Sequence, residues 1–172
     1  MDFRNIEGAE ELFRSVNGIS DGSNNIFFAF KNTNREGMKA GLAGGMIGAG
    51  LPGIIISKVA VTDSVVLNGS FAALLINQTE RGLGIIPMDQ KGLQLTLNVN
   101  KLVPDTENYI FIENEAISEI KVKNFSFLNK KLQTVNISID KIKLYLLARV
   151  AEKDIPYHEK NFAVFMDKYK KK

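Results

Sequence analysis

Few side chains in this sequence are of the types that carry out catalysis. Cysteine is absent and His158 is the only histidine, which excludes thiolate chemistry and any metal site that needs two histidines. His158 falls near the start of a predicted helix, where we expect a surface or capping residue. Glu113, Glu115 and Glu119 are the best candidates for an acid–base pair, but lysines alternate around them, which is typical of a solvated strand face. We therefore predict that the chain is not an enzyme and holds no cofactor and no metal.

A nucleotide site is not expected either. The run from Gly48 to Gly53 matches the GxGxxG spacing of dinucleotide-binding loops. Such a loop has to follow a strand and open a helix, so that the phosphates meet helix N–H groups. Here Pro52 interrupts the motif and a β-branched run follows it. No stretch interleaves basic and aromatic residues on one face, so the sequence also predicts no nucleic-acid binding.

The most unusual stretch is residues 37–53, which we call the glycine-rich segment. It holds seven glycines, and no charged residue lies between Lys39 and Lys58. Each glycine inside a helix costs about 1 kcal/mol relative to alanine, so close packing must offset that cost. Small residues spaced by four leave a flat helix face that another backbone can approach. The glycines of this small-xxx-small face are Gly37, Gly41, Gly44, Gly45 and Gly48.

Three surfaces remain open as the partner of the glycine-rich segment: its own domain, another copy of the chain, or lipid. The 17 uncharged residues from Ala40 to Ile56 would reach about 25 Å as a helix, less than the hydrocarbon layer of about 30 Å. Contact with a membrane would therefore be a shallow or re-entrant insertion. Apolar side chains would enter lipid and basic ones would lie near anionic head groups. The predicted contact residues are Leu42, Met46, Ile47, Leu51, Lys31, Arg35 and Lys39.

The composition is that of one globular domain. Of the 172 residues, 45% are hydrophobic and 24% are charged, and the formal net charge is +3. The start, MDFRNIEGAEEL, is acidic and amphipathic, which favours a cytoplasmic chain, with peripheral membrane contact as an option. No repeat or long linker divides the sequence. We therefore predict a single domain over residues 1–172, with the glycine-rich segment as an insertion.

Hydrophobic periodicity predicts a strand-rich body that follows a short helix. Ile6, Ala9, Phe13 and Val16 recur at helical spacing before Gly18. Residues 71–76 are apolar at every position, as expected of a strand covered on both faces. Strands are predicted over 26–30, 54–61, 71–76, 83–88, 93–99, 109–112, 117–127, 135–139 and 142–146.

The last third of the chain gives more specific expectations. Within 117–127 the inward-facing residues change from Ile120 and Val122 to Phe125 and Phe127, which predicts a β-bulge near Asn124. Asp140-Lys141 has the length of a tight hairpin turn.

A helix is predicted to close the chain. Asp154 is expected to cap it, with Pro156 in its first turn. An apolar stripe at helical spacing is predicted to pack in the core, and its members are Phe162, Phe165, Met166 and Tyr169.

The region from about Phe71 to Tyr169 resembles bacterial pleckstrin-homology-like (PH-like) and GRAM-like domains. The resemblance is carried by AALLINQTERGLGIIPM, by AISEIKVKNFSFLNKKLQTVNISI, and by a final helix that ends FAVFMDKY. It implies a mainly β (α+β) fold, in which a bent sheet or barrel is capped by the C-terminal amphipathic helix. The N-terminal helix and the glycine-rich segment are additions to that plan. In lipid-binding members, a basic loop after the first strand grips phosphates; here that loop, with Lys31, Arg35 and Lys39, continues into the glycine-rich segment.

The resemblance implies a non-catalytic binding module for lipid head groups, peptides or partner proteins. We predict that the chain contacts an anionic membrane surface or a partner protein through the glycine-rich segment. The alternative is a structural protein that self-associates through the small-xxx-small face and has no lipid role.

Replacing Ile47 and Leu51 together by Asp is expected to separate these alternatives. Co-sedimentation with anionic vesicles, lost in the variant, would indicate membrane contact, because buried carboxylates oppose insertion. A change in oligomer size alone, measured by size-exclusion chromatography, would indicate a subunit interface. If the variant unfolds, the segment packs on its own domain and the membrane prediction is wrong.

Overall fold

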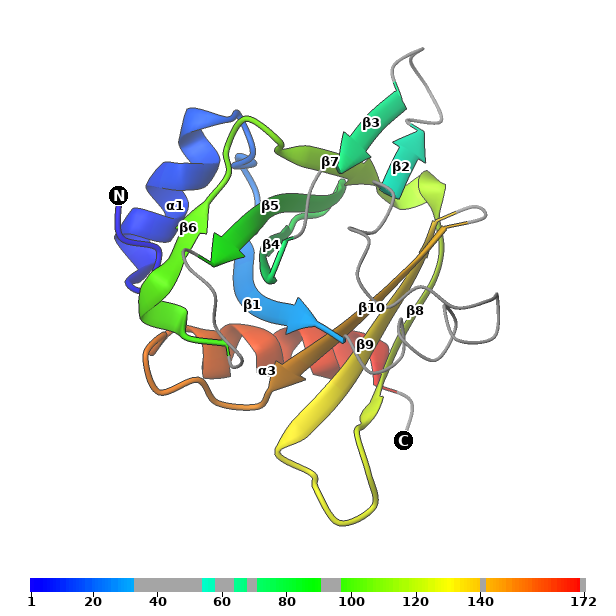
Figure 1. Ribbon diagram of the computed structural model, residues 1–172. Helices are drawn as coiled ribbons and strands as arrows, with labels where there is room; N and C mark the ends of the chain where they lie inside the picture. Colours follow the sequence, from blue (N-terminus) through cyan, green and yellow to red (C-terminus); the bar gives the residue numbers. More distant parts are fainter. Residues whose placement is uncertain (33–53, 58–63, 68–70, 91–96, 140–141, 171–172) are drawn as a thin grey trace, which may run out of the picture.

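The computed structural model describes residues 1–32, 54–57, 64–67, 71–90, 97–139 and 142–170 (Figure 1). Its helices are α1 (Ile6–Ser15) and α3 (His158–Tyr169). The strands are β1 (Asn25–Lys31), β2 (Ile54–Ser57), β3 (Ser64–Leu67), β4 (Ala73–Gln78), β5 (Gly82–Gln90), β6 (Leu102–Pro104), β7 (Ile110–Glu113), β8 (Ile117–Asn124), β9 (Leu132–Ile139) and β10 (Ile142–Arg149). The glycine-rich segment and most of the strand predicted over 93–99 lie outside the described residues.

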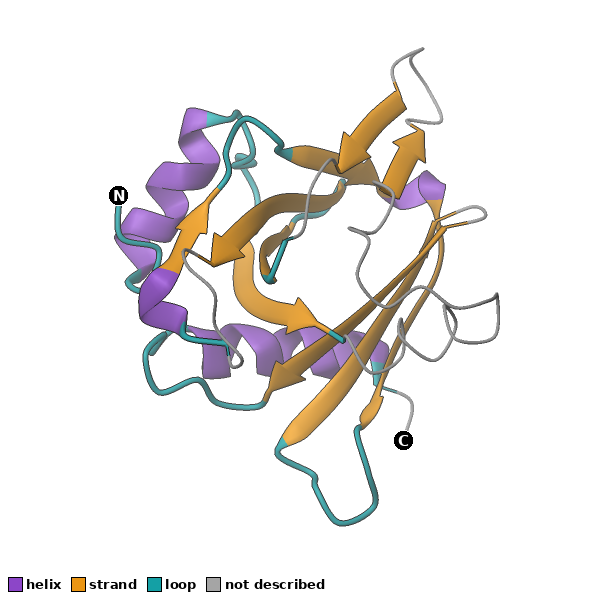
Figure 2. Cartoon of the chain, in the orientation of Figure 1, coloured by secondary structure: helices purple, strands orange, loops and turns teal. Residues whose placement is uncertain are grey.

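Eight of the described strands form one antiparallel sheet in the order β6-β5-β4-β1-β10-β9-β8, with β7 also paired to β5 (Figure 2). The start of β5 pairs with β7 and its end pairs with β6, so the sheet branches along one strand. Gly82 permits this close approach, because the Ile112 carbonyl of β7 occupies the place of a Cβ there. β2 and β3 pair only with each other among the described strands. The predicted mainly β fold with a helix at each end is confirmed.

The central strands are covered on both faces. One core, between the sheet and α3, contains Phe27, Leu74 and Ile137. A second core, between the sheet and α1, contains Phe13, Phe28 and Leu75. Every residue of β4 is buried, which confirms the expectation from its unbroken apolar run.

The apolar stripe of α3 is part of the first core, as predicted. Phe162 and Phe165 are both fully buried, and the Phe165 ring lies 4.4 Å from that of Phe27 and 4.8 Å from that of Tyr169, between ring centroids. Met166 packs against the same cluster. In Figure 1, α3 runs below β1, and the last strands cross in front of it; the helix covers the open side of the bent sheet.

α3 also completes the hydrogen bonding of β1 where the sheet splits. β1 pairs with β10 only at Phe30 and Lys31, so the earlier part of its outer edge has no strand partner among the described residues. The Phe28 N–H donates to His158 Nδ1 at 3.1 Å, and Asn161 Nδ2 donates to the Ile26 carbonyl at 2.8 Å. Two side chains of the helix thereby satisfy backbone groups that would otherwise be buried and unpaired.

The expectation of a surface role for His158 is therefore wrong. The side chain is fully buried and stacks on Phe162, and its Nε2 lies 2.7 Å from the Arg149 carbonyl at the end of β10. Since Nδ1 accepts a hydrogen bond, the proton is on Nε2 and the ring is neutral. Burial lowers the pKa of His158, and the hydrogen bond to Arg149 offsets part of that effect.

Three smaller expectations also differ from the structure. Asp154 is not the helix cap, because the chain first makes a turn that buries Ile155, and α3 begins only at His158. Val99 starts a 3₁₀ turn rather than ending a strand. No bulge occurs near Asn124: β8 ends there, and its register shift lies between Ile117 and Glu119.

Replacing Phe165 by Ala is expected to lower the free energy of unfolding by about 3–5 kcal/mol, the usual loss for a buried aromatic. Val164 on the same helix is 54% exposed, so Val164→Ala is the matched control and should change stability little. Urea denaturation of both variants measures the difference. Equal stabilities would show that the stripe of α3 is not buried.

Acidification is expected to destabilise the protein through His158. The unfolded chain binds a proton near pH 6.5, whereas the folded chain resists protonation until a lower pH. Stability is therefore complete above about pH 6.5 and falls below it, by up to about 1.4 kcal/mol per pH unit until the folded pKa is reached. Urea denaturation from pH 7 to 5 should show this slope in the wild type and a flatter one in His158→Gln. Identical slopes would contradict the assignment.

Candidate ligand-binding face

The last three strands of the sheet are apolar on one face and polar on the other. Val122, Ile137 and Leu144 point into the core between the sheet and α3. Because side chains alternate along a strand, the residues between them point to the opposite side. We call this side the polar face; it comprises Asn32, Lys121, Lys123, Asn136, Lys143 and Tyr145.

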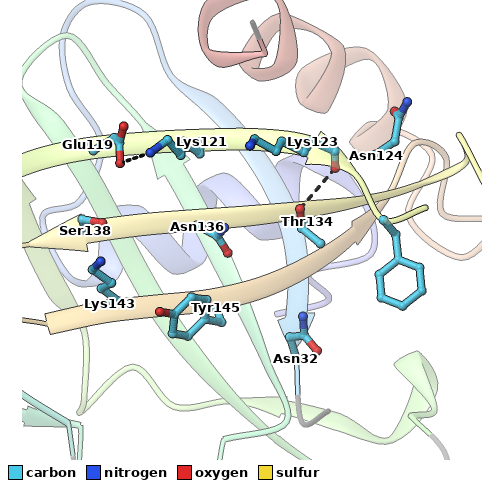
Figure 3. Close-up of a pocket in the computed structure, with 11 residues that line it drawn as sticks. Asn32, Glu119, Lys121, Lys123, Asn124, Thr134, Asn136, Ser138, Lys143 and Tyr145 are labelled. Carbon is cyan, nitrogen blue, oxygen red and sulfur yellow. Dashed lines mark hydrogen bonds and ion pairs between the residues drawn. The ribbon is translucent and has the colours of Figure 1, made fainter. Parts of the chain in front are cut away.

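Strand register lines these residues up in a row across the sheet. Lys121 of β8 lies opposite Asn136 of β9, which in turn lies opposite Tyr145 of β10. The row continues to Asn32, whose backbone N–H donates to the Tyr145 carbonyl at 3.1 Å. Residues from four separate segments of the chain therefore meet on one surface, and Figure 3 shows their side chains on the same side of the strands.

The polar face lines a hollow of about 560 Å³. Other residues that line it are Glu119, Asn124, Phe125, Thr134 and Ser138. Pockets of about 300–1,000 Å³ are the usual size for small-molecule ligands, although such pockets are generally more apolar than this one. The size and the polarity together favour a small, hydrophilic ligand.

The charge of the hollow is positive. It contains three lysines and one carboxylate, that of Glu119, which lies 2.6 Å from Lys121 Nζ. Lys123 and Lys143 have no ion pair with another described residue. Two ammonium groups on the same hollow are therefore available to an anionic ligand.

Two amide oxygens in the hollow lack hydrogen-bond donors. Asn32 is only 3% exposed, and its Oδ1 is buried with no partner. Asn136 Oδ1 is likewise buried and without a partner. A buried acceptor left unpaired costs about 1–3 kcal/mol. Because both oxygens are buried, a ligand that supplied donors would reach them only after the amide side chains turned toward the hollow.

A second hollow, of about 590 Å³, lies at the β5–β6 edge and is acidic. Burial, together with the charge of Asp105, raises the pKa of Asp89 in its lining. Asp105, however, already accepts hydrogen bonds from the backbone and side chain of Asn108. Its carboxylate is therefore used to stabilise a local turn, and we do not assign a ligand to this hollow.

Most residues predicted for binding lie outside the described part of the chain. They are Arg35, Lys39, Leu42, Met46, Ile47 and Leu51, together with Gly37, Gly41, Gly44, Gly45 and Gly48. Of the predicted set only Lys31 is described; it ends β1, and its Nζ lies 4.9 Å from the centroid of the Phe71 ring. Lys31 directly precedes Asn32, so one predicted residue adjoins the polar face.

The polar face was not predicted as a binding site. The sequence analysis noted only that Glu119 alternates with lysines on a solvated strand face. Glu113, Glu115 and Glu119 are exposed, as expected of a solvated face, and only Glu119 lines the hollow. A signal was present in the sequence: polar residues alternate on three consecutive predicted strands, ending with Lys143 and Tyr145. That alternation predicts one polar side, but it cannot show that Asn32 joins it.

Comparisons with known proteins do not assign a function, so the function has to be inferred from the site. A scan against protein-family models and searches of curated proteins and solved structures gave no match. Among the described helices, none has the length and hydrophobicity needed to cross a membrane. In the described part of the chain, no three side chains of the metal-binding types (His, Cys, Asp, Glu) are grouped closely enough to hold an ion.

Proposed function

We propose that the protein is a non-catalytic binding module of the PH-like kind, which binds a small anionic ligand on the polar face. The proposal rests on one observation: two lysines and two asparagines with unpaired amide oxygens line the same hollow. They are Lys123, Lys143, Asn32 and Asn136. No single segment of the chain contains this combination.

The chemistry of the hollow narrows the class of ligand. Ammonium groups attract phosphate or carboxylate oxygens, whereas the two amide oxygens need hydroxyl or N–H donors. A phosphorylated polyol carries both kinds of group, and its size suits a hollow of about 560 Å³. We therefore propose a phosphorylated polyol, free or as a lipid head group, as the ligand class.

The state of His158 supports the non-catalytic part of the proposal. Both ring nitrogens are engaged with backbone groups, and burial holds its pKa below the ordinary value. The only histidine of the sequence is thus unavailable as a general base.

The arrangement of elements supports the PH-like part. A bent antiparallel sheet with a C-terminal helix over its open side is the plan that the sequence resemblance implies, and the described strands follow it (Figure 2). The predicted contact through the glycine-rich segment, with a membrane or with another copy of the chain, stays a separate prediction because that segment is outside the described residues.

Isothermal titration calorimetry with glycerol phosphate, inositol trisphosphate and inositol hexakisphosphate tests the ligand class. Replacing Lys123 and Lys143 together by Ala is expected to weaken binding about tenfold or more, because two charge-assisted hydrogen bonds to phosphate are lost. Lys160→Ala, an exposed lysine on α3, is the matched control and should bind like the wild type. Lack of binding by the wild type, or equal weakening in the control, would contradict the proposal.

A further inference from the structure

The loop that joins β8 to β9 exposes three large apolar side chains. Phe125 is 44% exposed, Phe127 is 89% exposed and Leu128 is 92% exposed. They belong to residues 125–131, which we call the hairpin tip; it projects beyond the body of the protein at the bottom of Figure 1. The sequence pattern had suggested that both phenylalanines face the core, and the structure places them outside it.

Internal hydrogen bonds fix the shape of the hairpin tip. Ser126 Oγ accepts from the Asn129 N–H at 3.0 Å, and Asn129 Oδ1 accepts from the Lys131 N–H at 3.2 Å. Gln133, fully buried at the base, donates from Nε2 to the Lys130 carbonyl at 2.6 Å.

The backbone at the base of the tip is held too. The Phe125 N–H donates to the Leu132 carbonyl, and the Val150 N–H donates to the Lys131 carbonyl, both at 2.8 Å. A loop held in this way keeps Phe127 and Leu128 pointing outward, rather than letting them fold back on the sheet.

All charged residues in the part of the hairpin around the tip are positive. Residues 120–139 contain four lysines and no acidic residue. Lys123, Lys130 and Lys131 are exposed, and Lys170 at the end of α3 reaches the same region, with its Nζ 2.8 Å from Asn124 Oδ1. The nearby carboxylate on the β10–α3 connection, Glu152, is largely buried and paired with Arg149.

We infer that the hairpin tip docks the protein on an anionic lipid surface. Phe127 and Leu128 enter the boundary between head groups and acyl chains, and the exposed lysines behind them contact lipid phosphates. The inference goes beyond the proposed ligand of the polar face. It rests on Phe127, Leu128, Lys130 and Lys131, which do not line the hollow, whereas Lys123 and Phe125 belong to both surfaces.

The features of the tip favour lipid over a protein partner. The apolar residues form a projection rather than a groove, and the cations beside them are the exposed Lys123, Lys130 and Lys131 of the hairpin and Lys170 at the end of α3. Lysine is depleted in protein–protein interfaces, whereas lysines next to an apolar point are typical of surfaces that bind anionic membranes.

Co-sedimentation with vesicles tests the inference. Wild-type protein is expected to bind phosphatidylcholine vesicles that contain about 30 mol% phosphatidylserine, and to bind pure phosphatidylcholine much less. Replacing Phe127 and Leu128 together by Ser should lower the partition coefficient by about tenfold or more. Lys130→Ala and Lys131→Ala should each lower it by about fivefold. Val164→Ser, at an exposed apolar residue of α3, is the matched control and should change nothing.

A tryptophan reporter locates the contact without relying on loss of binding. The sequence contains no tryptophan, so Phe127→Trp introduces a single fluorophore at the tip. Its emission should shift to the blue and be quenched by brominated lipid when anionic vesicles are added, whereas that of Val164→Trp should not. The inference would be overturned if the wild type did not bind vesicles. It would also be overturned if the Phe127→Trp variant bound them without any change in its tryptophan emission. Loss of self-association in the serine variant, with vesicle binding unchanged, would also overturn it and assign the tip to a protein contact.

Discussion

The structure depends on how the backbone N–H and C=O groups along the outer edge of β1 find hydrogen-bond partners. β1 pairs with β10 only at its last two residues, and without compensation its earlier backbone groups on this edge would be buried and unpaired. His158 and Asn161 of α3 supply the missing hydrogen bonds, and His158 also reaches the end of β10. The same helix fills the opening with Phe162 and Phe165. One helix therefore closes the sheet both by polar contacts and by packing.

This closure determines where a function can lie. The interior of the described domain is occupied by two apolar cores, and its histidine is committed to backbone contacts. Two outer surfaces remain for a partner, the polar face and the hairpin tip. Both lie mainly on strands β8 to β10 or on their connections. Lys123 at the end of β8 stands between the two surfaces. A ligand on the polar face and a membrane at the tip could thus be bound by the same edge of the protein.

The sequence predicted those features that depend on local periodicity. The unbroken apolar run of β4 and the stripe containing Phe165 both pack as expected, because burial on two faces or on one stripe leaves a direct pattern. The environment of His158 could not be predicted, since its partner Phe28 lies 130 residues away. Phe127 was misread for a related reason: alternation looks the same whether a strand continues or turns into a loop. The polar face could not be predicted because its residues are aligned by the register between β8, β9 and β10. The alternation within a single strand carries no information on that register.

Amide NMR spectra of the protein with and without anionic lipid nanodiscs give the most direct test of the central claim, that binding occurs on the β8–β10 edge while the closed interior serves as scaffold. Chemical-shift changes are expected at residues 125–131 and along the polar face around Lys123. The amide of Phe28, bonded to His158 in the interior, should not shift. Changes concentrated on α1 or on the β5–β6 edge, with none at residues 125–131, would contradict the account.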